Sequence, residues 1–496
     1  MKRQCGILMP VFSLASPFGI GTFSKEAYEF IDFLKEAGQS CWQILPIGPT
    51  GFGDSPYQSA STFAGNPYFI DPVTLKENGL LSEEELWSYD FGSDPEKIDY
   101  GKLYNFRYLL LKHAFDRFAE QGGLADKDYL SFKKQEAGWL DDYSLFMALK
   151  RKQGGKSWLD WPKELRERQA AALNSARKDL EELIEFFCFQ QYEFFLQWNK
   201  LHAYAAKQGI EIIGDVPFFV SLDSCDVWSH PDAFEMSASH TPRAVAGTAD
   251  GQIWGNPVYD WKTMKKDHYA WWINRMRHAL RFYDVLRIDH FHGFLSCFAV
   301  PYGDKDTKQG KLEKGPGKEF FDEVRRQLGD IRMIAEDLGS VTEENQKLLA
   351  DTGIPGMKIL QYAFTSWDSI YMPHKIEKRS VVYTGNHDNP TTVSWAMGLN
   401  EGEMRFTRAY IRSWNTDYNG FTWDMIREAY HTPADLCIIP IGDYLCLKEE
   451  GRINTPGTAQ GNWTWRLRPN FLSSDLARDI RGLAEVYSRI PPKKEA

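Results

Sequence analysis

The chain has 496 residues, 43% of them hydrophobic and 25% charged, so it can bury a large core and is not disordered by composition. It carries 68 acidic against 58 basic residues, a formal net charge of −10. This balance argues against a nucleic-acid binder and fits a neutral substrate better than a strongly acidic one. No uninterrupted apolar stretch reaches the ~20 residues that a membrane-spanning helix needs, so we expect no membrane contact.

The start of the chain and its cysteines bear on location. In "MKRQCGILMPVFSLASPFGIG" two basic residues precede an apolar run, as in a signal peptide, but Pro10 and Pro17 interrupt the run and no A-x-A cleavage pattern follows. The seven cysteines are scattered without a CxxC pair, which is typical of reduced cytosolic thiols rather than of a disulfide framework or zinc ribbon. We therefore expect a cytoplasmic protein.

Eight short, continuously apolar runs end in Gly, Pro, Asp or His, as strands of a parallel sheet buried on both faces do. In chain order they are residues 5–14, 41–49, 209–220, 285–291, 331–339, 356–364, 380–388 and 435–445. Most gaps hold a helix-like segment, and the clearest are 26–38, 266–283, 318–328 and 409–430. Eight strands alternating with helices predict an α/β fold of the (β/α)8, or TIM barrel, type, with a doubly wound open sheet as the alternative.

The gap from about residue 50 to 208 is too long for an ordinary barrel connection. It is rich in helix formers and includes a long amphipathic stretch at 174–208. We interpret residues 1–49 and 209–496 as the catalytic barrel, with smaller loop insertions. Residues 50–208 are interpreted as a mostly helical subdomain inserted after the second strand.

Carboxylates stand at the ends of four predicted strands. Asp215 ends the third, Asp289 the fourth, Glu336 and Asp337 the fifth, and Asp388 the seventh. Active sites of (β/α)8 barrels lie at these C-terminal strand ends, so the side chains should converge at one mouth. Each acid alone is more often a helix cap, a turn residue or an ion-pair partner. Together they fit glycoside chemistry, which needs an acid for the leaving oxygen and a second carboxylate at the oxocarbenium-like carbon.

The fourth run, "VLRIDHFHG", concentrates charge at its end. Strand alternation places Arg287 and Asp289 on one face, ~6.6 Å apart, so that the arginine favours the charged form of the carboxylate. His290 and His292 take the other parity and spell H-x-H, a spacing that can chelate a metal ion. A metal site is the alternative interpretation, but only His387 lies at another late strand end to complete it.

Eight sequence blocks in order give the chain a specific resemblance. They are "GFGDSPYQSASTFAGNPYFID" (51–71), "GDVPFFVSLDSCDVW" (214–228), "GQIWGNPVYDW" (251–261), "LRIDHFHG" (286–293), "AEDLG" (335–339), "GIPGMKILQYAF" (353–364), "TGNHDN" (384–389) and "RINTPGTAQGNWTWRL" (452–467). Over nearly its whole length the chain resembles the 4-α-glucanotransferases (amylomaltases, or disproportionating enzymes), glycoside hydrolase family 77 of the α-amylase superfamily. The resemblance implies transfer of α-1,4-glucan segments between maltooligosaccharides by a retaining double displacement, without metal or organic cofactor.

The resemblance also implies roles for the carboxylates. Asp289 matches the family's nucleophile, which forms the covalent glycosyl-enzyme, and Glu336 matches the general acid/base. Asp388 matches the third carboxylate, which binds sugar hydroxyls and supports distortion of the substrate. Asp337 has opposite parity to Glu336 and is expected to be structural.

Further residues match substrate-binding positions of the family. Those near the cleaved bond are Arg287, His387, Asp215, Ser55 and Tyr57, the last as an aromatic platform under the sugar. Trp254 and Asn256 match a loop that covers the acceptor side.

Three departures from the family bear on the activity. Residues 244–257, "AVAGTADGQIWGNP", lack a Pro-Pro-Asp-aromatic tip expected to cover the acceptor sites, His292 replaces a usual Arg, and Gly442 an expected Gln. A lid that excludes water decides between transfer and hydrolysis, so the shortened loop leaves an α-1,4-glucan hydrolase as the alternative function. A catalytically inactive glucan-binding protein is a further alternative, which the presence of all three carboxylates disfavours.

Overall fold

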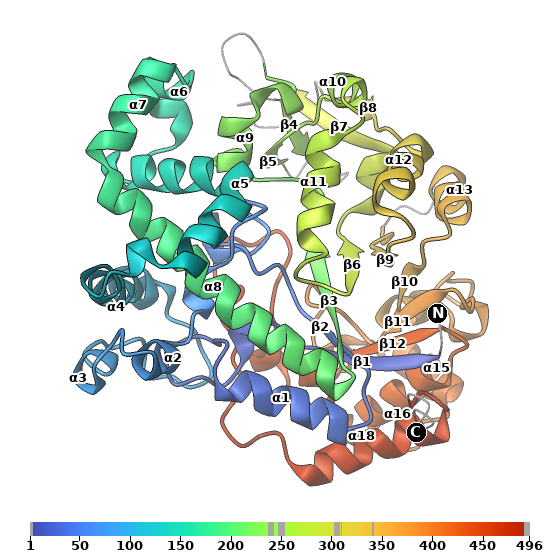
Figure 1. Ribbon diagram of the computed structural model, residues 1–496. Coiled ribbons are helices and arrows are strands. Elements are labelled where there is room, and N and C mark those ends of the chain that lie inside the picture. The colour runs from blue at the N-terminus through green and yellow to red at the C-terminus, as the bar shows by residue number, and fades with distance from the viewer. Residues whose placement is uncertain are drawn as a thin grey trace.

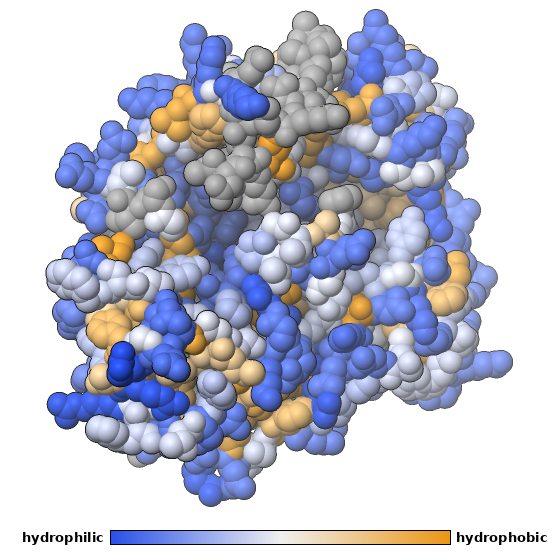
Figure 2. All heavy atoms as spheres, turned by 180° about the vertical axis from the view of Figure 1, so that it is seen from behind, coloured by the Kyte–Doolittle hydropathy of each residue, from blue (hydrophilic) through white to orange (hydrophobic). Residues whose placement is uncertain are grey.

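A computed structural model describes residues 3–236, 243–246, 253–301, 308, 310–339 and 342–490 of the chain, with the backbone alone for residue 52 and for 243–246. Figure 1 shows a barrel with a group of helices packed beside it. In the part of the chain that is described, no helix is long and apolar enough to cross a membrane. The face shown in Figure 2 is mainly hydrophilic, and its hydrophobic side chains lie in small separate groups.

Eight parallel strands close into a barrel in the order β1-β12-β11-β10-β9-β6-β3-β2. They are β1 (Gln4–Leu8), β2 (Cys41–Gln43), β3 (Glu211–Val216), β6 (Val285–Ile288), β9 (Met333–Ala335), β10 (Gly356–Ile359), β11 (Ser380–Tyr383) and β12 (Leu436–Pro440). Each of these strands lies within one predicted apolar run or overlaps its start, which confirms the (β/α)8 barrel. The open-sheet alternative is wrong, because β1 pairs with β12 and closes the sheet.

The strands are shorter than their apolar runs. The fourth run extends to residue 291, whereas β6 ends at Ile288, and the seventh extends to 388, whereas β11 ends at Tyr383. Apolar side chains continue past each strand because the loops at the barrel mouth are themselves buried. The polar ends of the runs therefore lie in loops rather than in strands.

A second sheet was not predicted. Its antiparallel strands β4 (Arg243–Ala246), β5 (Ile253–Pro257), β7 (Ser296–Pro301) and β8 (Lys311–Lys314) have the order β5-β4-β7-β8. They come from the connections that follow β3 and β6. Their short, partly polar sequences give little period-2 signal, which is why sequence patterning did not find them.

Three predicted barrel helices are confirmed within a few residues: α1 (Lys25–Glu36), α11 (Ala270–Ala279) and α12 (Lys318–Leu328). The prediction of one helix over 409–430 is wrong. The structure has α15 (Glu401–Ile411) and α16 (Tyr418–His431), since α15 ends at Arg412 in the left-handed conformation and the Asp417 side chain caps α16.

Residues 50–208 fold mainly as helices: α2 (Pro72–Glu77), α3 (Glu83–Leu86), α4 (Tyr100–Glu120), α5 (Lys127–Lys152), α6 (Lys163–Arg166), α7 (Ala170–Asp179) and α8 (Glu181–Gln208). The last of them, α8, packs on α5 but also on α1, with a hydrogen bond from Tyr204 Oη to Asp32, and it leads directly into β3. This helix thus contacts both groups, and the division into a barrel and an inserted subdomain stays a prediction.

The two ends of the described chain are tied together. Arg489, which follows α18 (Ser474–Val486), is fully buried. Its guanidinium donates to the carbonyls of Gln4, Tyr430, Thr432 and Ala434. These contacts hold the last helix against the seam where β1 meets β12.

Candidate active site

A cleft of about 680 Å³ lies at the C-terminal ends of the barrel strands. Eight of the ten predicted site residues line it: Ser55, Tyr57, Trp254, Asn256, Asp289, Glu336, His387 and Asp388. The other two, Asp215 and Arg287, lie beneath it with side chains 0% and 1% exposed. The predicted residues therefore gather at one place, although they come from elements far apart in sequence.

The neighbouring strands β3 and β6 build the floor of the cleft. Asp215 and Arg287 are paired in register, and Arg287 Nη1 lies 2.5 Å from Asp215 Oδ2. The same Nη1 lies 3.1 Å from Oδ1 of Asp289, which confirms the contact expected within "VLRIDHFHG". The Asp289 side chain is 26% exposed, so one buried arginine links a buried carboxylate to one that faces the cleft. An arginine stays charged at all working pH values and favours ionised neighbours, but burial outweighs this effect at Asp215 and raises its pKa to about 7.

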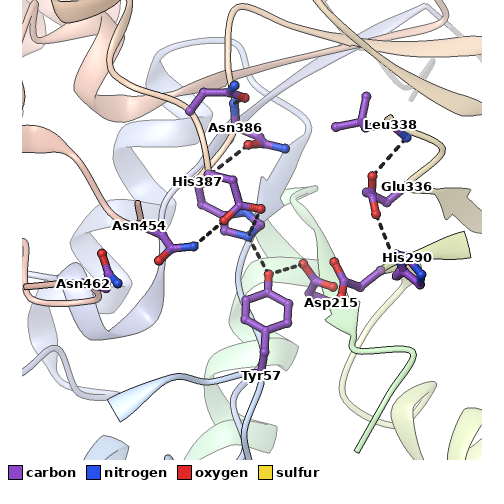
Figure 3. A network of polar contacts seen from close by, with 12 residues as sticks. Tyr57, Asp215, His290, Glu336, Leu338, Asn386, His387, Asn454 and Asn462 are labelled. Atoms are coloured by element: carbon purple, nitrogen blue, oxygen red, sulfur yellow. Dashed lines mark hydrogen bonds and ion pairs between the residues drawn. The ribbon is translucent and has the colours of Figure 1, made fainter. Parts of the chain in front are cut away.

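Tyr57, from the loop after β2, connects this floor to the loop after β11 (Figure 3). Its hydroxyl donates to Asp215 Oδ2 at 2.9 Å and lies 2.9 Å from Nε2 of His387, and its ring stacks on the imidazole with centroids 5.4 Å apart. Because the Tyr57 hydroxyl donates its proton to Asp215, the hydrogen bond between Tyr57 and His387 must be donated by His387 Nε2. Asp388 Oδ2 lies 3.3 Å from the same nitrogen.

Glu336 directly follows β9 and is held by backbone groups. Its Oε2 accepts from the N–H of His290 at 2.8 Å and its Oε1 from the N–H of Leu338 at 3.0 Å (Figure 3). Burial, and then the nearby charge of Asp289, raise the pKa of Glu336 to about 8. This carboxyl therefore holds a proton at neutral pH, as the sequence interpretation expected of a general acid.

Asp388 lies in the loop between β11 and α14 (Thr392–Gly398). Its Oδ1 accepts from Asn454 Nδ2 at 2.6 Å, and its backbone N–H donates to Asn386 Oδ1 at 2.9 Å. The Asp388 side chain is 37% exposed, which leaves it open to the cleft. Burial lowers the pKa of the adjacent His387, so that its imidazole is neutral at pH 7.

Sequence reasoning missed several lining residues. Asn386, Asn454, Asn462 and Trp463 line the cleft, together with Tyr362, Leu338 and residues 456–459. The block "RINTPGTAQGNWTWRL" contained a signal, because its Asn, Gly and Pro residues between aromatics predict an ordered loop rather than a strand or helix.

The predicted acceptor-side residues lie at one wall. The Trp254 ring packs edge-on against His290 with centroids 5.2 Å apart, and Asn256 Nδ2 donates to the Val220 carbonyl at 2.7 Å. Both are on β5. Part of the shortened loop, residues 247–252, lies outside the described residues.

In the part of the chain that the structure describes, His290 and His292 do not combine with a third side chain into a metal site. The His290 and His292 rings are 6.4 Å apart, and His290 packs among Phe218, Phe219 and Trp254. Among the residues described, no group of three or more His, Cys, Asp or Glu side chains could hold a metal ion. In the same part of the chain, Nε2 of His292 is buried with no hydrogen-bond partner.

The structure also shows what surrounds two further positions named from the sequence, Asp337 and Gly442. The Asp337 carboxylate accepts from the N–H of Met357 at 2.7 Å, away from Glu336, as expected of a structural acid. A Cβ at Gly442 would meet nothing closer than 3.8 Å, beside a cavity of about 20 Å³. Nothing in the structure explains why this position has no side chain.

A closed (β/α)8 barrel whose mouth holds a carboxyl group of raised pKa beside a carboxylate in contact with an arginine defines the class of barrel enzymes that act on glycosides. The family model described as 4-alpha-glucanotransferase matches residues 9–473, and the chain belongs to this glycoside hydrolase 77 family.

Known proteins agree with this assignment. The 4-alpha-glucanotransferase of Clostridium butyricum is 43% identical over 97% of this chain and 100% of its own, and that of Thermus thermophilus is 40% identical over 99% and 100%. The structure resembles that of amylomaltase from Streptococcus agalactiae in complex with acarbose, with a TM-score of 0.95 and 37% identity over 99% of this chain and 100% of that chain. The relatives' names do not favour the hydrolase alternative.

Proposed function

We propose that the protein is a 4-α-glucanotransferase that moves α-1,4-glucan segments between maltooligosaccharides through a covalent glycosyl-enzyme. The observation that carries this proposal is the pairing of Glu336, whose pKa is raised to about 8, with Asp289, which faces the cleft beside Arg287. One carboxyl group holds a proton while the other contacts a fixed cation, which fits the division of roles that retaining glycoside chemistry needs.

In the first step, Asp289 Oδ2 attacks the anomeric carbon of the donor. Oδ1 is held by Arg287, which leaves Oδ2 for the new C–O bond. As the glycosidic bond breaks, Glu336 gives its proton to the departing 4-oxygen, so that no free alkoxide forms. A retaining enzyme holds these two carboxyl groups ~5–5.5 Å apart, and we expect that separation here.

In the second step, the roles reverse. Glu336 is now ionised and removes the proton from the 4-hydroxyl of an acceptor glucan as that oxygen attacks the anomeric carbon. The bond to Asp289 then breaks. Two displacements at one carbon retain its α configuration, and the number of glycosidic bonds does not change.

The remaining residues are proposed to hold the sugars. Tyr57 presents its ring as a platform, while Asp388 and His387 bind hydroxyls of the donor sugar and favour its distorted ring. Asp388 is partly exposed and fixed by Asn454, so it can accept hydrogen bonds from two sugar hydroxyls without moving. Trp254 offers an aromatic face for an acceptor sugar, whose C–H surface packs on such rings.

Maltotriose as sole substrate tests the proposal. Transfer yields glucose together with products longer than maltotriose, while the total number of reducing ends stays constant. Hydrolysis yields one new reducing end per cleaved bond, and none of its products is longer than maltotriose. A steady rise in reducing ends without longer oligomers would overturn the proposal. A cytoplasmic location, and the absence of nucleic-acid partners, remain predictions from the sequence.

A further inference from the structure

The loop that carries His387 and Asp388 has both of its ends bonded to one carboxylate from a short helix elsewhere at the barrel mouth. The loop runs from Thr384, directly after β11, to Thr392, the first residue of α14. Asp443 lies opposite it on α17 (Ile441–Tyr444), the short helix that follows β12. No family motif quoted above assigns a role to Asp443.

The contacts are short and involve both carboxylate oxygens. Asp443 Oδ2 accepts from the hydroxyl of Thr384 at 2.6 Å and from the hydroxyl of Thr392 at 2.7 Å. Its Oδ1 accepts from the backbone N–H of Thr392 at 2.7 Å. One side chain therefore joins the two ends of a nine-residue segment and also binds a free N–H at the start of α14.

The burial of this carboxylate makes the arrangement unusual. Asp443 is 1% exposed, and Thr384 and Thr392 are both 0% exposed. Among the ion pairs of the described residues, none involves Asp443. A carboxylate buried without a cation is costly, so it persists where donors surround it, and here three donors do.

Other hydrogen bonds also reach the ends of the loop. The Gln361 N–H donates to the Thr384 carbonyl at 3.2 Å, Gln361 Nε2 donates to the Pro390 carbonyl at 2.9 Å, and Thr391 Oγ1 donates to the Lys448 carbonyl at 3.3 Å. Within the loop, Asn386 and Asn389 bond to each other, and Asn389 Nδ2 donates to Tyr362. At the cleft side, Asn454 Nδ2 holds Asp388. These contacts set the shape of the loop and the direction of its tip, while Asp443 adds three short bonds that join both ends to the helix after β12.

A cavity beneath the loop increases the importance of these bonds. About 20 Å³ of space is lined by Asn386, Asn389 and Thr391 on the loop and by Gly442 and Asp443 on α17. A Cβ at position 442 would lie 4.0 Å from Thr391 Cγ2, so the absence of a side chain there removes one packing contact from this side of the loop.

We propose that Asp443 is a positioning residue for the reaction: it holds the loop so that Asp388 and His387 meet the donor sugar. The proposal rests on the proposed role of Asp388. Without Asp443, three buried donors lose their partner and the loop can relax into the cavity. A shift of about 1 Å in a group that orients the substrate can reduce turnover on the order of 10²-fold.

A double-mutant cycle on maltotriose tests this. Asp443→Ala should lower kcat/KM by about 10- to 100-fold in the parent. In the Asp388→Ala background the same change should cost less than about threefold, since residues that act as a unit are not additive. Binding of acarbose should follow the same pattern. Asp443→Asn, which keeps an acceptor for the Thr392 N–H, should recover most of the parental turnover.

Asp71→Ala is the matched control. Asp71 is 4% exposed, and it too accepts from two backbone N–H groups and one threonine hydroxyl, at Val73 and Thr74, but it caps α2 away from the cleft. It should lower the melting temperature about as much as Asp443→Ala while leaving kcat/KM near the parental value. Should Asp443→Ala not fold, Thr384→Val removes one of the three bonds and should give a smaller loss of the same kind.

The outcomes are distinct. If Asp443→Ala costs the same factor in both backgrounds, its effect does not pass through Asp388 and the positioning role is overturned. If Asp388→Ala itself keeps the parental kcat/KM, the proposed role of Asp388 fails, and the inference about Asp443 fails with it. If Asp71→Ala lowers turnover as much as Asp443→Ala, loss of stability alone explains both.

Discussion

The ends of β6 and β9 are neighbours in the barrel, yet they surround their carboxylates in opposite ways. Asp289, after β6, is paired with the charged Arg287 and partly exposed. Glu336, after β9, lines the same cleft, and its two oxygens accept from backbone N–H groups. One carboxylate contacts a fixed cation and the other has its pKa raised to about 8, so it is the surroundings and not the residue type that assign their roles.

The largest expected effect comes from removing the anion. Asp289→Asn keeps the shape of the side chain but cannot form the glycosyl-enzyme, so kcat should fall roughly 10⁴-fold or more. Turnover of maltotriose measures this. Asp337→Asn is the control, because Asp337 bonds to the Met357 N–H and not to the cleft, and it should stay close to the parent. Comparable losses in both variants would contradict the assignment.

Removing the acid should have a smaller effect and a characteristic pH signature. Glu336→Gln should lower kcat about 10²- to 10⁴-fold. In the parent, kcat/KM should decrease above about pH 8, because the ionised Glu336 cannot protonate the leaving oxygen. The residual activity of Glu336→Gln should lack this decrease. A parental profile that keeps rising well above pH 8 would show that Glu336 is not the acid.

The next effect concerns the Tyr57 hydroxyl, which connects Asp215 on β3 with His387 in the loop after β11. Tyr57→Phe keeps the stacking ring but removes the hydroxyl between Asp215 and His387. Hydrogen bonds to charged groups contribute ~1.5–3 kcal/mol, so kcat/KM should fall roughly 10- to 100-fold. Tyr383→Phe removes a hydroxyl buried against Gln43 inside the barrel, outside the cleft, and should change stability rather than turnover. The opposite pattern would exclude a role for the Tyr57 hydroxyl.

The smallest effect concerns stability. The unfolded chain releases the Glu336 proton near its ordinary pKa of about 4.3, whereas the folded protein keeps it until about pH 8. Stability from this group is therefore fully present below the unfolded pKa and is lost as the pH rises through the folded pKa. Glu336→Gln should unfold at higher denaturant concentration than the parent near pH 9, with no such gain near pH 4. A gain of equal size at both pH values would contradict a raised pKa.

The sequence predicted the barrel because eight buried parallel strands leave eight continuous apolar runs. It also predicted the acids at the strand ends, since Asp215 is the last but one residue of β3 and Glu336 directly follows β9. It did not predict that β11 stops at Tyr383, five residues before Asp388, because a buried loop and a buried strand are equally apolar. The hydrogen bonds of Asp443 were out of reach for the same reason: contacts between distant segments leave no local pattern.

The pairing of β1 with β12 has a consequence for how the newly synthesised chain folds. Cys5 lies opposite Cys437 in this pair, and Arg489 holds the seam from still further along the chain. During synthesis β1 therefore leaves the ribosome long before β12 is made, and the barrel stays open at that edge until the chain has grown past residue 440. Contacts of such sequence separation are slow to form, so closing the seam is expected to limit the rate at which newly made chains become active.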